Sequence, residues 1–133
     1  MYIEDKYFDQ HPEYTYINNV VLGSFIDPKT LPTLLRELIA PIYENLSIDG
    51  MDNLLETFRK YMQNKKPTIV YFHCSQGVDR TGYVHAAYSM KYYKKSLEEA
   101  YKFNLQVLKN MRNRMHFNTY LGIEWYCLYL GRT

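Results

Sequence analysis

The residues best suited to chemistry are Cys74 and Arg80, which are separated by five residues. An apolar run over residues 68–72 precedes them, and a helix-compatible run over residues 83–88 follows. A strand that turns sharply into a helix directs several backbone N–H groups toward one point, at the positive end of the helix dipole. Such a nest binds a phosphate dianion, and it also lowers the pKa of a cysteine placed in it. The spacing therefore predicts a cysteine nucleophile that attacks phosphate esters.

The residues around this pair resemble those of a known family. Cys74 lies in the run His-Cys-Ser-Gln-Gly-Val-Asp-Arg-Thr-Gly, which begins at His73 and contains Gly77, Thr81 and Gly82. This run is similar to the phosphate-binding loop of the cysteine-based protein tyrosine and dual-specificity phosphatase superfamily. The resemblance implies hydrolysis of phosphomonoesters through a phosphocysteine intermediate, with no metal or other cofactor. The alternative is a buried structural cysteine beside a surface arginine, and it leaves the two glycines unexplained.

Each loop residue has an expected role. Cys74 as thiolate would attack phosphorus, and Arg80 would hold two equatorial phosphate oxygens with its planar guanidinium. Thr81 is expected to donate its hydroxyl to the sulfur, and Gly77 to adopt a backbone conformation that a Cβ resists. The other loop positions are expected to supply backbone N–H groups or to shape the loop: His73, Ser75, Gln76, Val78 and Gly82.

The leaving group needs a proton, and several aspartates are candidates for the general acid. Asp79 directly precedes Arg80, as in myotubularin-like lipid phosphatases and a group of bacterial tyrosine/lipid phosphatases with a Gly-x-Asp-Arg-Thr loop, and this resemblance implies that it is the acid. Asp49 is the alternative, since its segment resembles the approach to the separate acid loop of dual-specificity phosphatases. Asp27 and Asp52 are the remaining candidates. Both leading residues also have a structural interpretation, Asp79 as a partner that orients Arg80 and Asp49 as a helix cap.

Asn118 is a further candidate near the end of the chain. Its segment resembles the one before the family's last helix, where an asparagine or glutamine helps to order the site. Capping of that helix explains Asn118 equally well.

Composition favours a single domain over residues 1–133. The chain is 47% hydrophobic, carries a formal net charge of +2 and has only two cysteines, with no close pairing. This predicts a soluble protein of a reducing compartment, the cytoplasm, without a membrane span, secretory signal or metal site. Cys127 lies in an apolar run and is expected to be buried; a role as resolving thiol for an oxidised Cys74 is the alternative.

The order of elements predicts an α/β fold. After an irregular lead-in over residues 1–16, a strand is expected over 17–24 and a central strand from residue 68. Helices are expected at about 33–43, 52–63, 80–94, 96–111 and 118–130, and Pro41 is a position at which the first could be interrupted. This order resembles a small dual-specificity phosphatase domain, which has a short central sheet flanked by helices and a mostly helical C-terminal half. The part before the loop is abbreviated, and one or two strands of that fold are hard to find.

The substrate class stays open on the sequence alone. A protein bearing phosphotyrosine, or a dual-specificity substrate, ranks first, and a monomer is expected. Phosphoinositides or inositol phosphates rank second, because the Val-Asp-Arg part of the loop resembles lipid phosphatases. An RNA 5′-triphosphatase ranks third, since a net charge of +2 is small for nucleic-acid binding. A catalytically weak module that captures a phosphorylated partner is the alternative from a different class.

Overall fold

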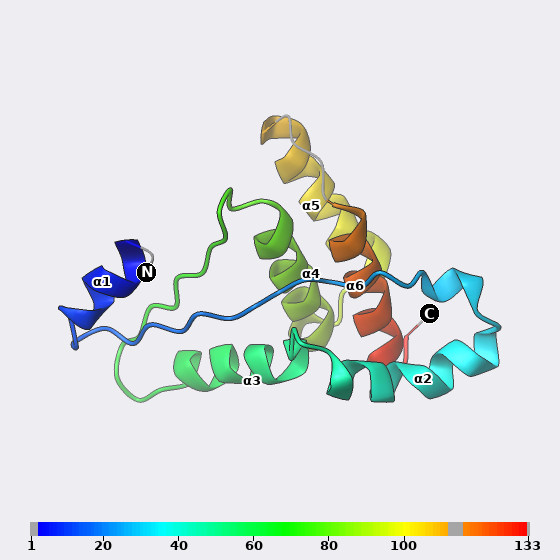
Figure 1. The fold of residues 1–133 in the computed structure, drawn as a ribbon, viewed down its shortest axis with the longest axis horizontal. Helices are drawn as coiled ribbons and strands as arrows, with labels where there is room; N and C mark the ends of the chain where they lie inside the picture. Colours follow the sequence, from blue (N-terminus) through cyan, green and yellow to red (C-terminus); the bar gives the residue numbers. More distant parts are fainter. Residues whose placement is uncertain (1–2, 112–115, 133) are drawn as a thin grey trace.

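A computed structural model of the chain describes residues 3–111 and 116–132, and its regular elements in these residues are all helices (Figure 1). The α-helices are α1 (Ile3–Asp9), α2 (Thr33–Leu46), α3 (Met51–Met62), α4 (Asp79–Tyr93), α5 (Leu97–Met111) and α6 (Phe117–Tyr129), and a short 3-10 helix, η1, spans Pro28–Thr30. The five expected helices are therefore present, each close to its expected bounds. None of the described helices is long and apolar enough to cross a membrane.

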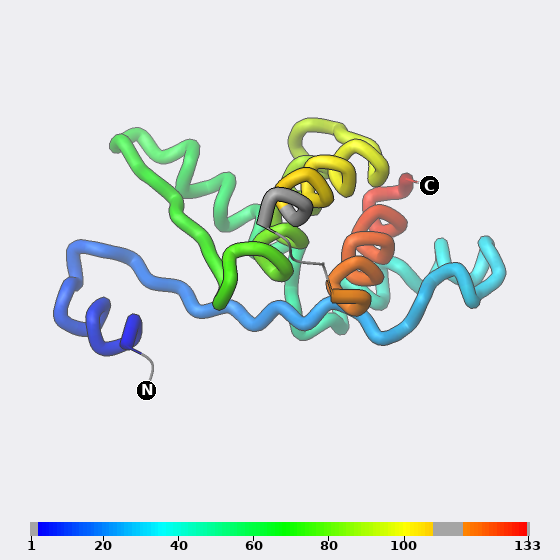
Figure 2. The backbone as a smooth tube through the Cα atoms, turned by 90° about the horizontal axis from the view of Figure 1, so that it is seen from above, coloured from blue at the N-terminus to red at the C-terminus, as the bar shows by residue number. Residues whose placement is uncertain are grey.

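The prediction of a central β-sheet is wrong. Within the described residues there is no β-strand, and the segments 17–24 and 68–73 run as irregular connections (Figures 1 and 2). A strand requires backbone hydrogen bonds to a neighbouring strand, and none joins these two segments. Most of their apolar side chains are also left in solvent, with Val20 55% and Ile69 94% exposed, although Val21 is buried. The α/β assignment therefore fails for lack of partner strands in the abbreviated part before the loop.

The lead-in over residues 1–16 also differs from expectation, because residues 3–9 form α1. Glu4 and Asp5 lie in its first turn, where carboxylates interact favourably with the helix dipole. No residue of α1 is buried, so this helix is attached to the molecule only by surface contacts.

The hydrophobic core forms where α4 and α6 pack together and α3 closes one side. The fully buried side chains include Met90 of α4, Ile123 and Tyr126 of α6, and Leu55 of α3. Cys127 belongs to the same cluster and is 3% exposed, as its apolar run predicts. Figure 2 shows α4, α5 and α6 gathered together. The N-terminal connection, residues 10–27 between α1 and η1, passes alongside them.

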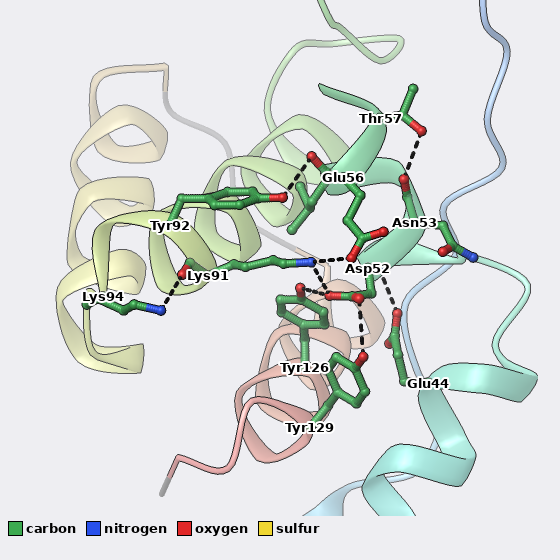
Figure 3. Close-up of polar contacts among 11 residues, drawn as sticks. Glu44, Asp52, Asn53, Glu56, Thr57, Lys91, Tyr92, Lys94, Tyr126 and Tyr129 are labelled. Atoms are coloured by element: carbon green, nitrogen blue, oxygen red, sulfur yellow. Dashed lines mark hydrogen bonds and ion pairs between the residues drawn. The ribbon is translucent and has the colours of Figure 1, made fainter. Parts of the chain in front are cut away.

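One partly buried polar cluster joins the helices α2, α3, α4 and α6 around Asp52 of α3 (Figure 3). Its Oδ1 accepts hydrogen bonds from Lys91 Nζ at 2.8 Å and Tyr126 Oη at 2.7 Å, and its Oδ2 accepts one from Tyr129 Oη at 3.2 Å. The backbone N–H of Asp52 donates to Glu44 Oε1 of α2 at 2.9 Å. Burial alone would raise the pKa of Asp52, but these donors outweigh it and lower the pKa.

The N-terminal connection lies against α6. Gly23 has φ +79°, and a Cβ there would stand 2.1 Å from the backbone oxygen of Asn118. A Cβ on Gly122 would be only 2.8 Å from the ring of Tyr83. Three polar contacts continue this attachment: Ser24 N–H to Asn118 O at 2.8 Å, Trp125 Nε1–H to Ile26 O at 2.7 Å, and Lys29 Nζ to Glu124 Oε1 at 2.6 Å.

Helix α2 continues through Pro41 without an interruption. It packs on α6 through Tyr43, whose ring stacks on Trp125 with a centroid distance of 4.7 Å. Its opposite face is apolar and open to solvent. The exposed residues on that face recur every fourth position: Leu34, Leu38, Ile42 and Leu46.

The turn between α4 and α5 follows local sequence signals. Lys94 ends α4 with φ 58°, a left-handed cap. Ser96 and Glu99 then form a capping box, in which Ser96 N–H donates to Glu99 Oε2 at 2.8 Å and Glu99 N–H donates to Ser96 Oγ at 3.1 Å. These signals fix the start of α5, and α5 in turn packs along α4.

Candidate active site

The loop around Cys74 is placed at the N-terminus of α4. Gly77 has φ +67°, the left-handed conformation that its lack of a Cβ permits. Val78 is the residue before the helix and is 4% exposed, so it anchors the loop to the core. Its carbonyl accepts the backbone N–H of Gly82 at 2.8 Å, which closes the first turn of α4. The N–H groups that precede this turn therefore face the loop.

Cys74 is partly buried in this loop. Burial of the sulfur opposes its ionisation, but the hydroxyl of Thr81 and the backbone N–H groups of Thr81, Gln76 and Val78 outweigh that effect and lower the pKa of Cys74 to about 6. The Thr81 oxygen is buried and has no hydrogen-bond partner within ordinary distance among the described residues. The three backbone N–H groups are therefore the principal donors to the sulfur. At neutral pH the sulfur is largely thiolate.

Arg80 is exposed on the first turn of α4. Among the described residues, no carboxylate or carbonyl group forms a hydrogen bond or ion pair with its guanidinium. All five N–H donors are therefore available to an oxyanion that enters the loop.

His73 makes two ring contacts. Its Nδ1 lies 3.2 Å from the backbone oxygen of Cys74, and its Nε2 lies 2.9 Å from Oε1 of Glu4 on α1. The first contact fixes the backbone beside the nucleophile. The second brings the acidic N-terminal helix next to the loop, although both side chains of this pair remain substantially exposed.

Asp79 connects the start of α4 to the start of α6. Its Oδ1 accepts hydrogen bonds from the backbone N–H of His116 at 2.8 Å and from the hydroxyl of Thr119 at 2.6 Å. The other carboxylate oxygen, Oδ2, has no such partner among the described residues. Since Asp79 directly precedes Arg80, this link also fixes the position of the first turn of α4.

The other three aspartates are engaged away from the loop. Both oxygens of Asp49 accept backbone hydrogen bonds, from Leu22 at 2.6 Å and Gly23 at 2.8 Å, and the residue is 3% exposed. Burial raises the pKa of Asp49 despite these two donors. Asp27 caps η1 by accepting the N–H of Lys29 at 2.8 Å, and Asp52 is the centre of the polar cluster in Figure 3.

Asn118 binds the N-terminal connection instead of the loop. Its side-chain amide donates to the backbone oxygen of Leu22, and its own backbone oxygen accepts the N–H of Ser24. The residue before α6 is His116, so Asn118 is not the N-cap of that helix. The capping interpretation is therefore wrong, and the described contacts of Asn118 are structural.

Two residues next to the loop have no role in the sequence analysis. Thr119 is 1% exposed and holds Asp79, and Asn104 is 5% exposed and donates to the backbone oxygen of Gly82 at 2.7 Å. Asn104 carries a detectable signal, because it is a polar residue four positions after the buried Ala100 of α5. Thr119 carries none, since a threonine in the first turn of a helix is ordinary.

Cys127 is the second free cysteine. It lies on α6 within the core, and burial raises its pKa. Its thiol is therefore protonated at neutral pH and poorly reactive. Among the described residues, no group of three or more His, Cys, Asp or Glu side chains is placed to hold a metal ion.

Most of the chain matches a known protein family. The family model for the dual specificity phosphatase catalytic domain matches residues 40–126, which include the loop, all of α3, α4 and α5, and parts of α2 and α6. The chain belongs to the dual specificity phosphatase family. No curated protein matches the chain, and no solved structure does. For this dual specificity phosphatase domain, the family match therefore establishes a phosphatase and leaves its substrate to be argued from the site.

Proposed function

We propose that this chain hydrolyses phosphotyrosine-bearing proteins, as a tyrosine or dual-specificity phosphatase, through a phosphocysteine intermediate on Cys74. The observation that carries the proposal is the position of Cys74 in the loop directly before α4, where backbone N–H groups surround the sulfur and lower its pKa to about 6. A thiolate at neutral pH is the nucleophile that this chemistry needs.

The first step forms the phosphoenzyme. The Cys74 thiolate attacks phosphorus in line, an S–P bond forms, and the P–O bond to the leaving group breaks. A general acid donates a proton to the departing oxygen. Arg80 holds two equatorial oxygens of the phosphoryl group and compensates the charge that develops there.

The second step releases phosphate. The residue that gave its proton now acts as a base and takes one from water. The oxygen of that water attacks phosphorus, the S–P bond breaks, and the electron pair returns to Cys74 as thiolate. Thr81 and the loop N–H groups stabilise the sulfur as it leaves.

Among the aspartates, we assign the acid to Asp79. Hydrogen bonds to its Oδ1 hold the carboxyl in place, and its Oδ2 has no partner in the described part of the chain and is available to carry the proton. Asp49 is a weaker candidate, because both of its oxygens are occupied by backbone donors and the group is buried.

Protein phosphotyrosine is the substrate class that the loop composition favours over inositol phosphates. Ser75, Gln76 and Val78 place no lysine in the loop. Ligands that carry several phosphates usually need additional cations beside the one that holds the reacting group.

The test is steady-state hydrolysis of an aryl phosphate and a phosphotyrosine peptide by the wild type, Cys74→Ser, Asp79→Asn and Asp49→Asn. We expect no turnover by Cys74→Ser. Asp79→Asn should lower kcat for the peptide by about 10²- to 10⁴-fold and affect the activated aryl ester much less, because a good leaving group needs no proton. Asp49→Asn should affect both substrates equally.

A matched control separates acid catalysis from positioning. Asparagine at position 79 still offers an oxygen to His116 and Thr119, whereas Thr119→Val removes one of these donors and keeps the carboxyl group. A loss that Thr119→Val reproduces would contradict the acid role. Turnover only of inositol lipids or RNA 5′ ends would contradict the substrate class, and folded wild type that is inactive on every ester would contradict the enzyme itself.

A further inference from the structure

A groove lies between the C-terminal end of α3 and the C-terminal end of α4, away from the loop. Three of its residues are cationic, two are amides, one is aromatic and one is acidic. The lining residues are Glu56, Arg59, Lys60, Gln63, Asn64, Lys65 and Tyr92.

The positive charge of this groove is not neutralised. Arg59, Lys60 and Lys65 form no ion pair with a carboxylate among the described residues. The acidic residue, Glu56, is already bound to Lys91 at 3.3 Å. The groove therefore presents three available cations, in a chain whose formal net charge is only +2.

Arg59 is held in a defined position. Its guanidinium lies 5.2 Å from the centre of the Tyr92 ring, and its Nη1 donates to Tyr88 Oη at 3.4 Å. Stacking on an aromatic face leaves the edge of the guanidinium and its other donors open to a ligand.

Helix stabilisation accounts for only part of this charge. Arg59 and Lys60 lie in the last turn of α3, where cations interact favourably with the helix dipole. Lys65 lies beyond the end of the helix and gains nothing from the dipole, yet it lines the same groove.

Helix α4 connects the groove to the loop, since Arg80 lies in its first turn and Tyr92 next to its end. At about 1.5 Å per residue, these two positions are about 18 Å apart along the helix. An extended peptide covers that distance with about five or six residues. Helix α3 is also coupled to the loop, because its Phe58 packs on Phe72 with a centroid distance of 5.2 Å.

We propose that this groove binds an acidic segment of the phosphorylated protein substrate, about five to eight residues from the phosphotyrosine. The inference rests on the proposed function of Cys74. The Asp and Glu carboxylates of such a segment can form ion pairs with Arg59, Lys60 and Lys65, which line the groove together.

Binding is tested with Cys74→Ser protein, which does not need to turn over, and fluorescein-labelled phosphotyrosine peptides. The peptides carry three Glu or three Gln at six to eight positions from the phosphotyrosine, on its N-terminal or C-terminal side. In one of these two directions, fluorescence anisotropy should show about three- to tenfold tighter binding of the Glu peptide, as expected for several exposed ion pairs. This preference should shrink as salt is raised.

Charge reversal then tests the location. Lys60→Glu/Lys65→Glu should abolish the preference for the Glu peptide, and in the Cys74 protein it should raise KM for that peptide without changing hydrolysis of an aryl phosphate. The control Lys95→Glu/Lys102→Glu has the same net charge change on exposed lysines outside the groove, and it should keep the preference. Lys60→Gln/Lys65→Gln provides a milder variant if charge reversal impairs folding.

Equal binding of Glu and Gln peptides would overturn the proposal, as would equal effects of the groove and control variants. Binding of vesicles that contain a phosphoinositide, dependent on Lys60 and Lys65 and without any peptide preference, would overturn it in favour of a lipid. Failure of the proposed function would look different, since it would abolish aryl phosphate turnover in the wild type and leave the binding experiment interpretable.

Discussion

The helices that follow the loop and the segments that precede it differ sharply in packing. In α4 and α6, many apolar side chains are buried: Met90, Ile123 and Tyr126 are each 0% exposed. In segments 17–26 and 68–72, most apolar side chains face solvent, and Phe25 and Tyr71 are each more than 80% exposed. The loop with Cys74 lies at the boundary between these two regions.

The exposed segments give the whole chain an unusually large accessible surface. The chain exposes 9514 Å², whereas a monomeric protein of 16.0 kDa typically exposes about 7,400 Å². Helices satisfy their backbone hydrogen bonds locally and need only one packed face, but a strand needs a neighbour. The site therefore has a well-packed support on the α4 side and a weakly supported approach on the other.

The largest expected contrast comes from the same substitution in the two regions. Ile123→Ala should lower the free energy of unfolding by about 2–5 kcal/mol, because it creates a cavity in the core. Ile69→Ala should change it by less than about 0.5 kcal/mol, since Ile69 is 94% exposed. Urea unfolding followed by circular dichroism measures both. A cost for Ile69→Ala close to that of Ile123→Ala would show that segment 68–72 is packed in solution.

The attachment of the N-terminal connection to α6 can be tested at two glycines. Gly23 and Gly131 have similar positive φ values, +79° and +70°, but only at Gly23 would a Cβ collide with backbone. Gly131→Ala should cost about 1 kcal/mol for backbone strain. Gly23→Ala should cost about 1–3 kcal/mol more. Equal losses in thermal or urea unfolding would mean that the contact between Gly23 and Asn118 does not persist.

The Asp52 cluster should contribute less than the core but in a pH-dependent way. Asp52→Asn should destabilise the protein by about 1–3 kcal/mol at pH 7, because it removes a carboxylate that accepts three hydrogen bonds. The folded pKa of Asp52 is lowered, so this stabilisation is fully present above the unfolded value of about 3.9 and is lost as pH falls through the lower folded value. Urea titrations from pH 7 to pH 2 should therefore show the wild type and Asp52→Asn converging in acid. A gap that is constant with pH would contradict the charged role of Asp52.

Substitutions in the loop itself should change the free energy of unfolding least. Their main effect should be on the reactivity of Cys74. Alkylation of Cys74 by iodoacetamide should follow a titration with a midpoint near pH 6, while Cys127 should stay unmodified in the folded protein. Thr81→Val should move that midpoint upward by removing one donor. Mass spectrometry of the modified peptides distinguishes the two thiols. A Cys74 midpoint near that of an ordinary cysteine would contradict the electrostatic description of the loop.

The same contrast explains how much the sequence can predict. Helices α2 to α6 are predictable because their signals are local: apolar periodicity, and the Ser96–Glu99 capping box at the start of α5. The position of residues 73–78 directly before α4 is predictable because these residues are contiguous with the helix. The sheet prediction failed because pairing of strands 17–24 and 68–72 depends on partners that are distant in sequence or missing from it.

Within the site, predictability ends where the contacts become long-range. The link from Asp79 to Thr119 and the bond from Asn104 to Gly82 join residues on different helices, so no local pattern announces them. Helix α1 is not predicted from the sequence. Glu4 and Asp5 suit a helix start, but the segment has little apolar periodicity and buries no residue.

The most direct test of the central claim is to trap the phosphoenzyme. Wild type, Cys74→Ser and Cys127→Ser are mixed with an aryl phosphate, quenched in acid within the first turnover and digested for mass spectrometry. The account predicts one added phosphoryl group on the peptide that contains Cys74, in the wild type and in Cys127→Ser, and none in Cys74→Ser. A phosphoryl group on another residue, or turnover that persists in Cys74→Ser, would contradict it.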